Sequence, residues 1–386
     1  KAYGPQRDGR RRVWEERIMS RSTLQHRGAA LLVTLRRPQK LNALDADLVT
    51  ELRTHYAAAA TAGASPRGRV VVLRGEGRAF CAGGDVAAVR QAGLETQTSP
   101  ADFFRQEYRL NAAIGGLEDK HGVVHVSLWD GIVMGGGVGL SAHGRFRVAT
   151  EKTVFAMPET AIGFFPDVGA ARVLAQMPRA SGVYAALTGA RLLPSDVSHT
   201  RLATHYVKSE NVDALVEALA ALEAPRLNFG DAVGRVLDAA AEAPPETSTL
   251  AAHADLIERC FGQPSVEGVF RALRGEPQDA FVQETLRALD RASPTSLKIA
   301  KALVDRAAGA TLRDVLATDM RVASRLVDPR PSALYGDTPP DFYEGVRAAL
   351  VDKNKNPRWR ATLDQVDDAF VQSHFEAIDD DLSFED

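Results

Sequence analysis

The sequence predicts an α/β fold followed by a helical C-terminal region. Between residues 28 and about 160, short apolar or β-branched runs alternate with a helical pattern and with glycine turns. From about residue 211 onward, helical spacing dominates and strand-like runs become rare. Alternating strands and helices favour a layered α/β domain. We therefore expect an α/β core over 28–225 and a helical region over 226–386, preceded by an Arg-rich arm over 1–27.

The core elements can be assigned in order along the chain. A helix ending near Gly63 is expected where Leu44, Leu48, Leu52 and Tyr56 recur every four residues. The expected strands are short, apolar or β-branched runs: Ala29–Leu35, Arg69–Arg74, Val123–Leu128, Arg145–Ala149 and Thr153–Met157.

The C-terminal region contains segments with helical spacing, separated by proline-rich stretches. The expected helices are Val212–Leu222, Phe281–Ala292 and Leu297–Ala308. The separating stretches are Ala243–Thr247 and Asp328–Pro340.

Composition and charge exclude several classes of protein. The 386 residues include 47 Lys+Arg and 50 Asp+Glu, a net charge of −3, whereas a general nucleic-acid binder carries a positive excess. The two cysteines, Cys81 and Cys260, cannot form a disulfide framework or a four-cysteine zinc site. The most apolar long window, Val123–Ala142, is interrupted by polar residues and five glycines, so no membrane span is expected.

Two glycine clusters follow predicted strands. Residues 137–142 match a loose dinucleotide fingerprint, but a helix there would end at His143-Gly144 after a few residues, so we discount a nucleotide cofactor. Glycines at a helix start expose backbone amides that can stabilise a negatively charged oxygen. Each cluster alone could equally serve close strand–helix packing. Together, Gly135–Gly137 and Gly83-Gly84 predict the two donors of an oxyanion hole.

Two carboxylic acids lie in an otherwise apolar segment. Glu159 and Asp167 each follow a proline, and Ile162, Phe164 and Phe165 lie between them. Burial among such side chains raises a carboxyl pKa toward the range of a general acid or base. A proline followed by an acid also suits a first helical turn. Two acids in this setting favour catalysis over that structural role.

Three other candidate groups are weaker. Ser141 lacks the glycine that would complete a nucleophile elbow, so we expect a structural role. His121 and His125 are four residues apart at a strand entry, where that spacing does not align them, and we expect no metal site. Cys81 has no basic partner in the sequence and reads as a small packed residue.

Several motifs resemble the enoyl-CoA hydratase/isomerase (crotonase) superfamily over about residues 28–370. The general motifs are Arg37-Pro38, Asn42-Ala43-Leu44, Phe80–Asp85 and Met134–Gly137. Within the superfamily, four further motifs resemble a branch that hydrolyses thioesters: Phe155–Gly163, Phe165–Gly169, Ser293–Lys298 and Asp341–Ala348. The resemblance implies a spiral of ββα units with a C-terminal helical region.

The resemblance also implies a reaction. Related hydratases carry a Glu where Gly139 stands and use it with a second Glu at the position of Glu159, whereas Asp167 replaces a usual glycine. Thioester hydrolysis by Glu159 and Asp167 is therefore the better match. The implied substrate is a short-chain acyl-CoA, with 3-hydroxyisobutyryl-CoA of valine breakdown as the expected one. The alternatives are an enoyl-CoA hydratase or isomerase, and a non-catalytic relative associated with mitochondrial ribosomes.

Roles for individual residues follow from the same resemblance. The amides of Gly84 and Gly136 are expected to bind the thioester oxygen. Glu159 attacks the carbonyl or activates water, and Asp167 transfers the proton or positions water and a substrate hydroxyl. The remaining expected contacts are Glu107 at the substrate, with Lys40, Ala82 and Asp85 at coenzyme A. No cofactor is expected beyond the coenzyme A of the substrate.

Location and assembly are also expectations of the resemblance. Residues 7–27 hold seven arginines, as a mitochondrial presequence does, but also three acids, which such presequences avoid. A solvated arm fits equally well. We expect a mitochondrial protein, or a cytoplasmic one in a bacterium, and a homo-oligomer such as many superfamily members form.

Overall fold

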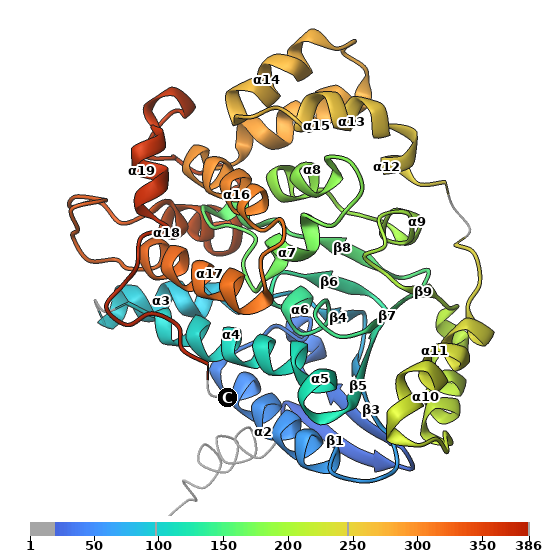
Figure 1. Ribbon diagram of the computed structural model, residues 1–386. Helices are drawn as coiled ribbons and strands as arrows, with labels where there is room; N and C mark the ends of the chain where they lie inside the picture. The colour runs from blue at the N-terminus through green and yellow to red at the C-terminus, as the bar shows by residue number, and fades with distance from the viewer. Residues whose placement is uncertain (1–19, 97–98, 245–246, 385–386) are drawn as a thin grey trace, which may run out of the picture.

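A computed structural model describes residues 20–96, 99–244 and 247–384, and its strands form two sheets (Figure 1). The larger sheet contains, in spatial order, β1 (Ser22–Arg27), β2 (Ala30–Leu35), β3 (Arg69–Gly75), β5 (Val123–Trp129), β7 (Phe146–Ala149) and β9 (His205–Tyr206). The smaller sheet contains β4 (Ala79–Cys81), β6 (Ile132–Met134) and β8 (Val154–Ala156). Only the β1–β2 pair is antiparallel among the strands of this part of the chain.

The chain alternates between the two sheets as it advances. Strands β3, β5 and β7 of the large sheet are each followed directly by β4, β6 and β8 of the small sheet. Helices then return the chain to the next position of the large sheet, which is the connection that parallel strands require. This progression is a spiral of ββα units, and it confirms the predicted fold class.

Apolar side chains cover both faces of the large sheet. The odd-numbered residues of β2, Leu31, Val33 and Leu35, belong to the main core. The even-numbered Ala30 and Leu32 belong to a second cluster, against which α10 (Val212–Ala220) and α11 (Phe229–Ala240) pack. Burial on both faces explains why the strands read as continuous apolar runs.

The helices of the core and of the C-terminal region share the main cluster, which runs from Leu31 to Leu382. The core helices are α2 (Ala46–Ala62), α3 (Val86–Thr96), α4 (Ala101–Gly115), α5 (Leu117–His121), α6 (Gly136–Gly139), α7 (Ala170–Leu174), α8 (Ser181–Thr188) and α9 (Pro194–His199). The later ones are α12 (Thr249–Ala252), α13 (Ala254–Phe261), α14 (Val266–Gly275), α15 (Ala280–Arg291), α16 (Pro294–Arg306), α17 (Leu312–Leu326), α18 (Asp341–Val346) and α19 (Asp368–Ser373).

Short helical turns complete the chain. Among the described residues, five of them are 3-10 turns: η1 (Pro38–Lys40), η2 (Glu159–Ile162), η3 (Ser209–Asn211), η4 (Arg226–Asn228) and η6 (Leu363–Gln365). The turn η5 (Arg347–Val351) is a π-helix that continues α18. No helix in the described ranges is both long and apolar enough to cross a membrane.

The predicted core strands and helices are confirmed to within a few residues, with one correction at the N-terminus. Residues 22–27, which we assigned to the arm, form β1 and pair with β2. The burial of β1 alternates weakly, because it is an edge strand with one solvated side, so its sequence STLQHR lacks a strong strand signal. The rest of the arm, residues 1–19, lies outside the described residues.

Candidate active site

The predicted site segments lie at one edge of the small sheet. Gly83-Gly84 follows β4, Gly135-Gly136 follows β6 and Pro158-Glu159 follows β8. These strands are parallel neighbours in the order β4-β6-β8, with Cys81 paired to Val133 and Met134 to Ala156. Carboxyl ends of parallel strands meet at the same edge, which is where α/β folds place their sites. The topology therefore brings both glycine clusters and Glu159 together.

The amides of Gly84 and Gly136 lie close together. A Cβ atom at Gly136 would lie 3.4 Å from the Gly84 nitrogen, and one at Gly83 would lie 3.7 Å from the Gly136 nitrogen. Within the part of the chain that the structure describes, neither amide donates a hydrogen bond. The loop after β4 is held by Leu44, whose amide donates to the Gly83 carbonyl at 2.8 Å. Two free, fixed donors are what an oxyanion hole requires.

Neither Gly135 nor Gly136 has room for a side chain. Gly135 has φ 48 and ψ −123, a conformation that L-residues avoid, and a Cβ there would lie 2.9 Å from Oε1 of Glu159. A Cβ at Gly136 would overlap Oε1 of Glu107 and lie 2.9 Å from Leu44. The carboxyls of Glu107 and Glu159 thus approach the backbone that follows β6. The helix α6 behind it is four residues long, in line with the short helix expected there.

Glu159 is a buried acid with an unpartnered oxygen. It begins η2, is 7% exposed, and its Oε2 has no hydrogen-bond partner among the described residues. Burial raises the pKa of Glu159 well above its usual range, and the negative charges of Asp167 and Glu107 add to the effect. A buried carboxyl that lacks a partner is costly. Because this burial costs folding stability, it indicates that the Glu159 carboxyl serves to contact a ligand.

Asp167 is held by a tyrosine from α4. Its carboxyl is 5% exposed, and the hydroxyl of Tyr108 donates to Oδ2 at 2.7 Å. Burial raises the pKa of Asp167 to about 7, although the Tyr108 hydrogen bond acts in the opposite direction. Asp167 therefore changes protonation state near neutral pH, which suits a group that transfers protons.

Glu107 is the third acid of the site. It is 2% exposed, its Oε1 has no partner in the described ranges, and burial and the charge of Asp167 raise its pKa well above the usual range. Carboxylates that sense one another in a low-dielectric site cannot all ionise together. Glu107, Glu159 and Asp167 therefore each favour the protonated form more than a solvent-exposed carboxyl does.

A second acid at position 139 has no room in this fold. A Cβ at Gly139 would lie 2.7 Å from Cβ of Val168 and 2.8 Å from Nδ2 of Asn111. Asn111 lies one turn beyond Glu107 on α4 and is fully buried. The volume that a hydratase glutamate would need is already filled.

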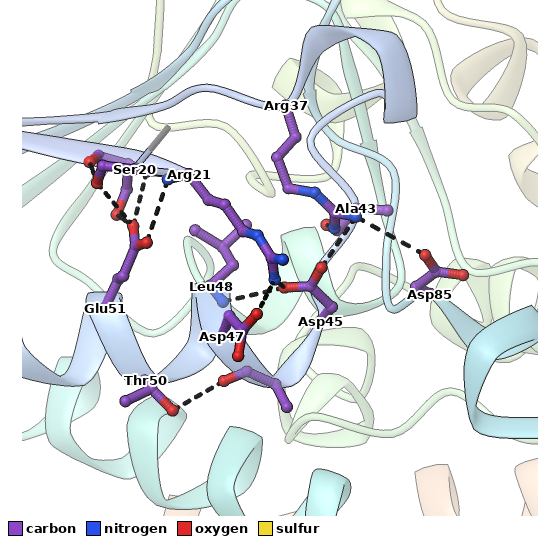
Figure 2. A network of polar contacts seen from close by, with 12 residues as sticks. Ser20, Arg21, Arg37, Ala43, Asp45, Asp47, Leu48, Thr50, Glu51 and Asp85 are labelled. Carbon is purple, nitrogen blue, oxygen red and sulfur yellow. Dashed lines mark hydrogen bonds and ion pairs between the residues drawn. The ribbon is translucent and has the colours of Figure 1, made fainter. Parts of the chain in front are cut away.

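Backbone hydrogen bonds join the segments expected at coenzyme A. The amide of Ala82 donates to Leu41 O at 3.0 Å, and that of Asp85 donates to Leu44 O at 2.7 Å. Figure 2 shows the guanidinium of Arg37 between Asp45 and Asp85, with Nη2 2.9 Å from the Asp45 carboxylate and 3.9 Å from that of Asp85. Lys40 lies on η1 and is exposed. A coenzyme A role for Lys40, Ala82 and Asp85 stays a prediction.

The weaker candidates have structural roles in the fold. The Ser141 hydroxyl donates to Gly137 O at 2.7 Å, and the His125 ring lies 2.6 Å from the Tyr56 hydroxyl. Cys81 is buried, which raises the pKa of its thiol to about 12 and keeps it protonated.

Sequence reasoning missed three buried polar residues around Asp167. Asn111 follows Glu107 by four residues and Tyr108 by three, so a helix assignment for Ala101–Gly115 would have placed it beside both of them. Asp319 on α17 accepts the Gly169 amide at 2.7 Å. The sequence signal that could have identified Asp319 is a single acid among the apolar residues on the buried face of α17.

The raised pKa values make stability depend on pH. The unfolded chain loses these carboxyl protons near pH 4, whereas folded Asp167 keeps its proton up to about pH 7. Between these pH values the folded state binds more protons, so stability falls as pH rises. We expect a free energy of unfolding lower at pH 8 than at pH 5, with about 1–3 kcal/mol of the difference removed by Asp167→Asn. Urea unfolding at both pH values measures this, and an identical pH dependence in the two proteins would contradict it.

The chain matches a known family along most of its length. A family model described as "Enoyl-CoA hydratase/isomerase" matches residues 30–375. The curated "3-hydroxyisobutyryl-CoA hydrolase, mitochondrial" of Xenopus tropicalis is 41% identical over 354 residues, which cover 91% of this chain and 87% of the relative.

Two solved structures are similar along nearly the whole fold. A carnitinyl-CoA dehydratase from Mycobacterium thermoresistibile has a TM-score of 0.80 and 35% identity, covering 95% of this chain and 99% of that one. An enoyl-CoA hydratase from Rhodobacter sphaeroides 2.4.1 has a TM-score of 0.81 and 32% identity, covering 95% and 100%. The names of these relatives include a hydrolase, a dehydratase and a hydratase. The geometry of the site must therefore decide between hydrolysis and hydration.

Proposed function

Because the chain belongs to the enoyl-CoA hydratase/isomerase family, we propose that it hydrolyses 3-hydroxyisobutyryl-CoA to 3-hydroxyisobutyrate and free coenzyme A. The observation that carries this proposal is the pair of buried acids, Glu159 and Asp167, beside the free amides of Gly84 and Gly136, with no acid at position 139. Curated hydrolases of that name from frog and human, 41% and 37% identical, support the substrate. The reaction belongs to valine breakdown.

The first step is polarisation of the thioester carbonyl. The oxygen lies between the Gly84 and Gly136 amides, which gain most when the carbonyl carbon becomes tetrahedral and its oxygen negative. Because both donors are fixed by the sheet edge, they need no rearrangement as charge develops. One such donor typically contributes about 10²–10³ in rate.

Glu159 supplies the attacking group. Either its carboxylate attacks the carbonyl and forms an anhydride that water then opens, or it removes a proton from the attacking water. In both routes the carbon–sulfur bond breaks and the coenzyme A sulfur leaves with a proton. Asp167 moves that proton and the proton of water, since its pKa near 7 lets it both hold and release one. Glu107 lines the acyl pocket.

A hydratase or isomerase is the second candidate, favoured by the names of the two similar solved structures. Hydration by a pair of acids needs the second one at position 139, where Asn111 and Val168 leave no space. We expect Gly139→Glu to lose stability without gaining hydration of crotonyl-CoA. Comparing the thermal unfolding and the crotonyl-CoA absorbance assay of this variant with the wild type tests that; a folded Gly139→Glu that hydrates would favour the second candidate.

Free thiol release from a panel of acyl-CoA thioesters tests the function. We expect kcat/KM for 3-hydroxyisobutyryl-CoA to exceed that for isobutyryl-CoA, which lacks only the hydroxyl, by about 10²-fold or more, because buried acids left without that hydroxyl are penalised. Equal rates on both would contradict the substrate. No release from any thioester, together with co-sedimentation with ribosomes, would favour a non-catalytic relative.

The location and assembly belong to the same proposal. The frog and human relatives are named mitochondrial, which supports a mitochondrial location for this chain. Fractionation of cells that express the full-length protein tests this. A homo-oligomer stays a prediction, which light scattering of the purified protein measures. The proposed binding partner of this chain is the acyl-CoA substrate, and no nucleic-acid partner is proposed.

A further inference from the structure

The turn that carries Asp167 has an unfavourable backbone conformation. Val168 has φ 55, a left-handed value that β-branched residues rarely adopt, and Gly169 follows with φ 75. Two successive left-handed residues reverse the chain directly after the proposed catalytic acid. Such a conformation persists only where surrounding contacts impose it.

Four hydrogen bonds restrain this turn. Tyr108 donates to the Asp167 carboxyl, and Ala170 N donates to the Asp167 carbonyl at 2.8 Å. The His143 ring, through Nε2, lies 2.7 Å from the Val168 carbonyl, and the Gly169 amide donates to Oδ2 of Asp319 at 2.7 Å. The first three restraints come from the α/β core. Asp319 comes from α17, 150 residues further along the chain.

Asp319 is an unusual residue for its place on α17. It is 0% exposed, and its helical neighbours Leu316, Met320 and Ala323 are buried apolar residues. Its other oxygen, Oδ1, has no hydrogen-bond partner in the described ranges. Helix packing alone is better served by an apolar side chain, because burying a carboxyl costs free energy. The cost points to a function for the contact with Gly169.

We propose that Asp319 is a positioning residue for Asp167. By accepting the Gly169 amide it holds the Asp167–Gly169 turn in its left-handed conformation, and thereby fixes the Asp167 carboxyl against Tyr108 and the site. The C-terminal region is then a working part of the catalytic site, and not only a cover for the core. The proposal rests on the proposed function for its kinetic readout.

The contact requires an acceptor oxygen, because Oδ2 of Asp319 receives the Gly169 amide at 2.7 Å. Burial raises the pKa of Asp319 well above its usual range, and the negative charge of Asp167 adds to the effect. The Gly169 hydrogen bond acts in the opposite direction on this pKa, and that hydrogen bond needs an acceptor oxygen at this place. Asp319→Asn keeps such an oxygen at the same place, whereas Asp319→Leu removes it at similar volume.

Kinetics of these two variants provide the test. We expect Asp319→Leu to lower kcat by about 10- to 100-fold with KM within about 3-fold, because a small displacement of a catalytic group costs that much. Asp319→Asn should keep kcat within about 3-fold of the wild type. In an Asp167→Asn background, Asp319→Leu should lower kcat by less than about a further 3-fold, because the two residues act as one unit.

Asp196 on α9 offers a matched control. It is also a buried aspartate, and it accepts the Leu250 amide at 3.0 Å away from the acids of the site. Asp196→Leu should lower the melting temperature while kcat of the folded protein stays within about 2-fold. Loss of kcat in Asp319→Leu but not in Asp196→Leu separates positioning from general stability.

Hydrogen exchange gives a readout independent of activity. Amides of the peptide spanning residues 167–171 should exchange about 10-fold faster in Asp319→Leu and at the wild-type rate in Asp319→Asn. Should Asp319→Leu not fold, Asp319→Ala carries the same expectations, since it only removes atoms. The proposal is overturned by unchanged exchange and kcat in the apolar variant, by equal loss in the Asn variant, or by full additivity with Asp167→Asn. An inactive wild type with the expected exchange pattern would instead overturn only the proposed function.

Discussion

Glu159→Gln is expected to lower kcat for thioester hydrolysis by about 10³- to 10⁴-fold. The amide can neither attack the carbonyl nor accept a proton from water. The variant should fold as well as the wild type, because a neutral amide replaces a buried carboxyl whose Oε2 has no partner in the described ranges. Steady-state thiol release and thermal unfolding measure the two effects.

The matched control for this prediction is Glu151→Gln. Glu151 is an exposed glutamate on the turn after β7, where its Oε2 accepts the Ser209 amide at 2.9 Å. The same chemical change there should leave kcat within about 2-fold. Wild-type turnover by Glu159→Gln, or an equal loss in both variants, would contradict the assignment of Glu159.

Single turnover in ¹⁸O-labelled water distinguishes the two routes for Glu159. If the carboxylate attacks the carbonyl, water opens the anhydride and label enters the Glu159 side chain. If it activates water, label enters only the released acid. Mass spectrometry of the peptide that contains Glu159 reads this directly.

Asp167→Asn is expected to lower kcat by about 10²-fold and to change the pH profile. Because the pKa of Asp167 is about 7, Asp167 gains a proton as pH falls below that value and can then no longer accept one during the reaction. Wild-type activity should therefore rise with pH through about 7. The variant should lose this acid limb, while its amide still accepts the Tyr108 hydroxyl.

The pH dependence of kcat/KM in both proteins checks this prediction. A matched control is Asp130→Asn, which changes a partly buried aspartate that accepts the Thr150 hydroxyl at 2.9 Å outside the site. Its acid limb should stay at the wild-type pH. Persistence of the limb in Asp167→Asn would show that another group controls activity.

The sequence predicted the parts of the site that follow strands. Gly84, Gly136 and Glu159 each come directly after a short apolar run, and parallel strands place their carboxyl ends at one edge. Asp167 was found because an acid among phenylalanines is conspicuous in the sequence. Local pattern and strand order were sufficient to place these residues near one another, and their catalytic roles stay predictions.

The features that the sequence did not predict depend mainly on contacts between distant segments. Asp319 meets Gly169 only because α17 packs against α4 and α7, and nothing in the local pattern of α17 specifies which helix it contacts. Tyr108 and Asn111 required the face of α4 to be known. The edge strand β1 was not predicted, because one side of it is solvated and its sequence lacks a clear strand pattern. Tertiary packing decides these features.

We propose that this site hydrolyses a thioester and does not hydrate a double bond. The most direct measurement compares two initial rates in one preparation of the wild type: thiol release from 3-hydroxyisobutyryl-CoA, and hydration of crotonyl-CoA. We predict that hydrolysis exceeds hydration by at least about 10³-fold in kcat/KM, because no second acid fits at position 139. Hydration at a rate equal to or above that of hydrolysis would contradict it.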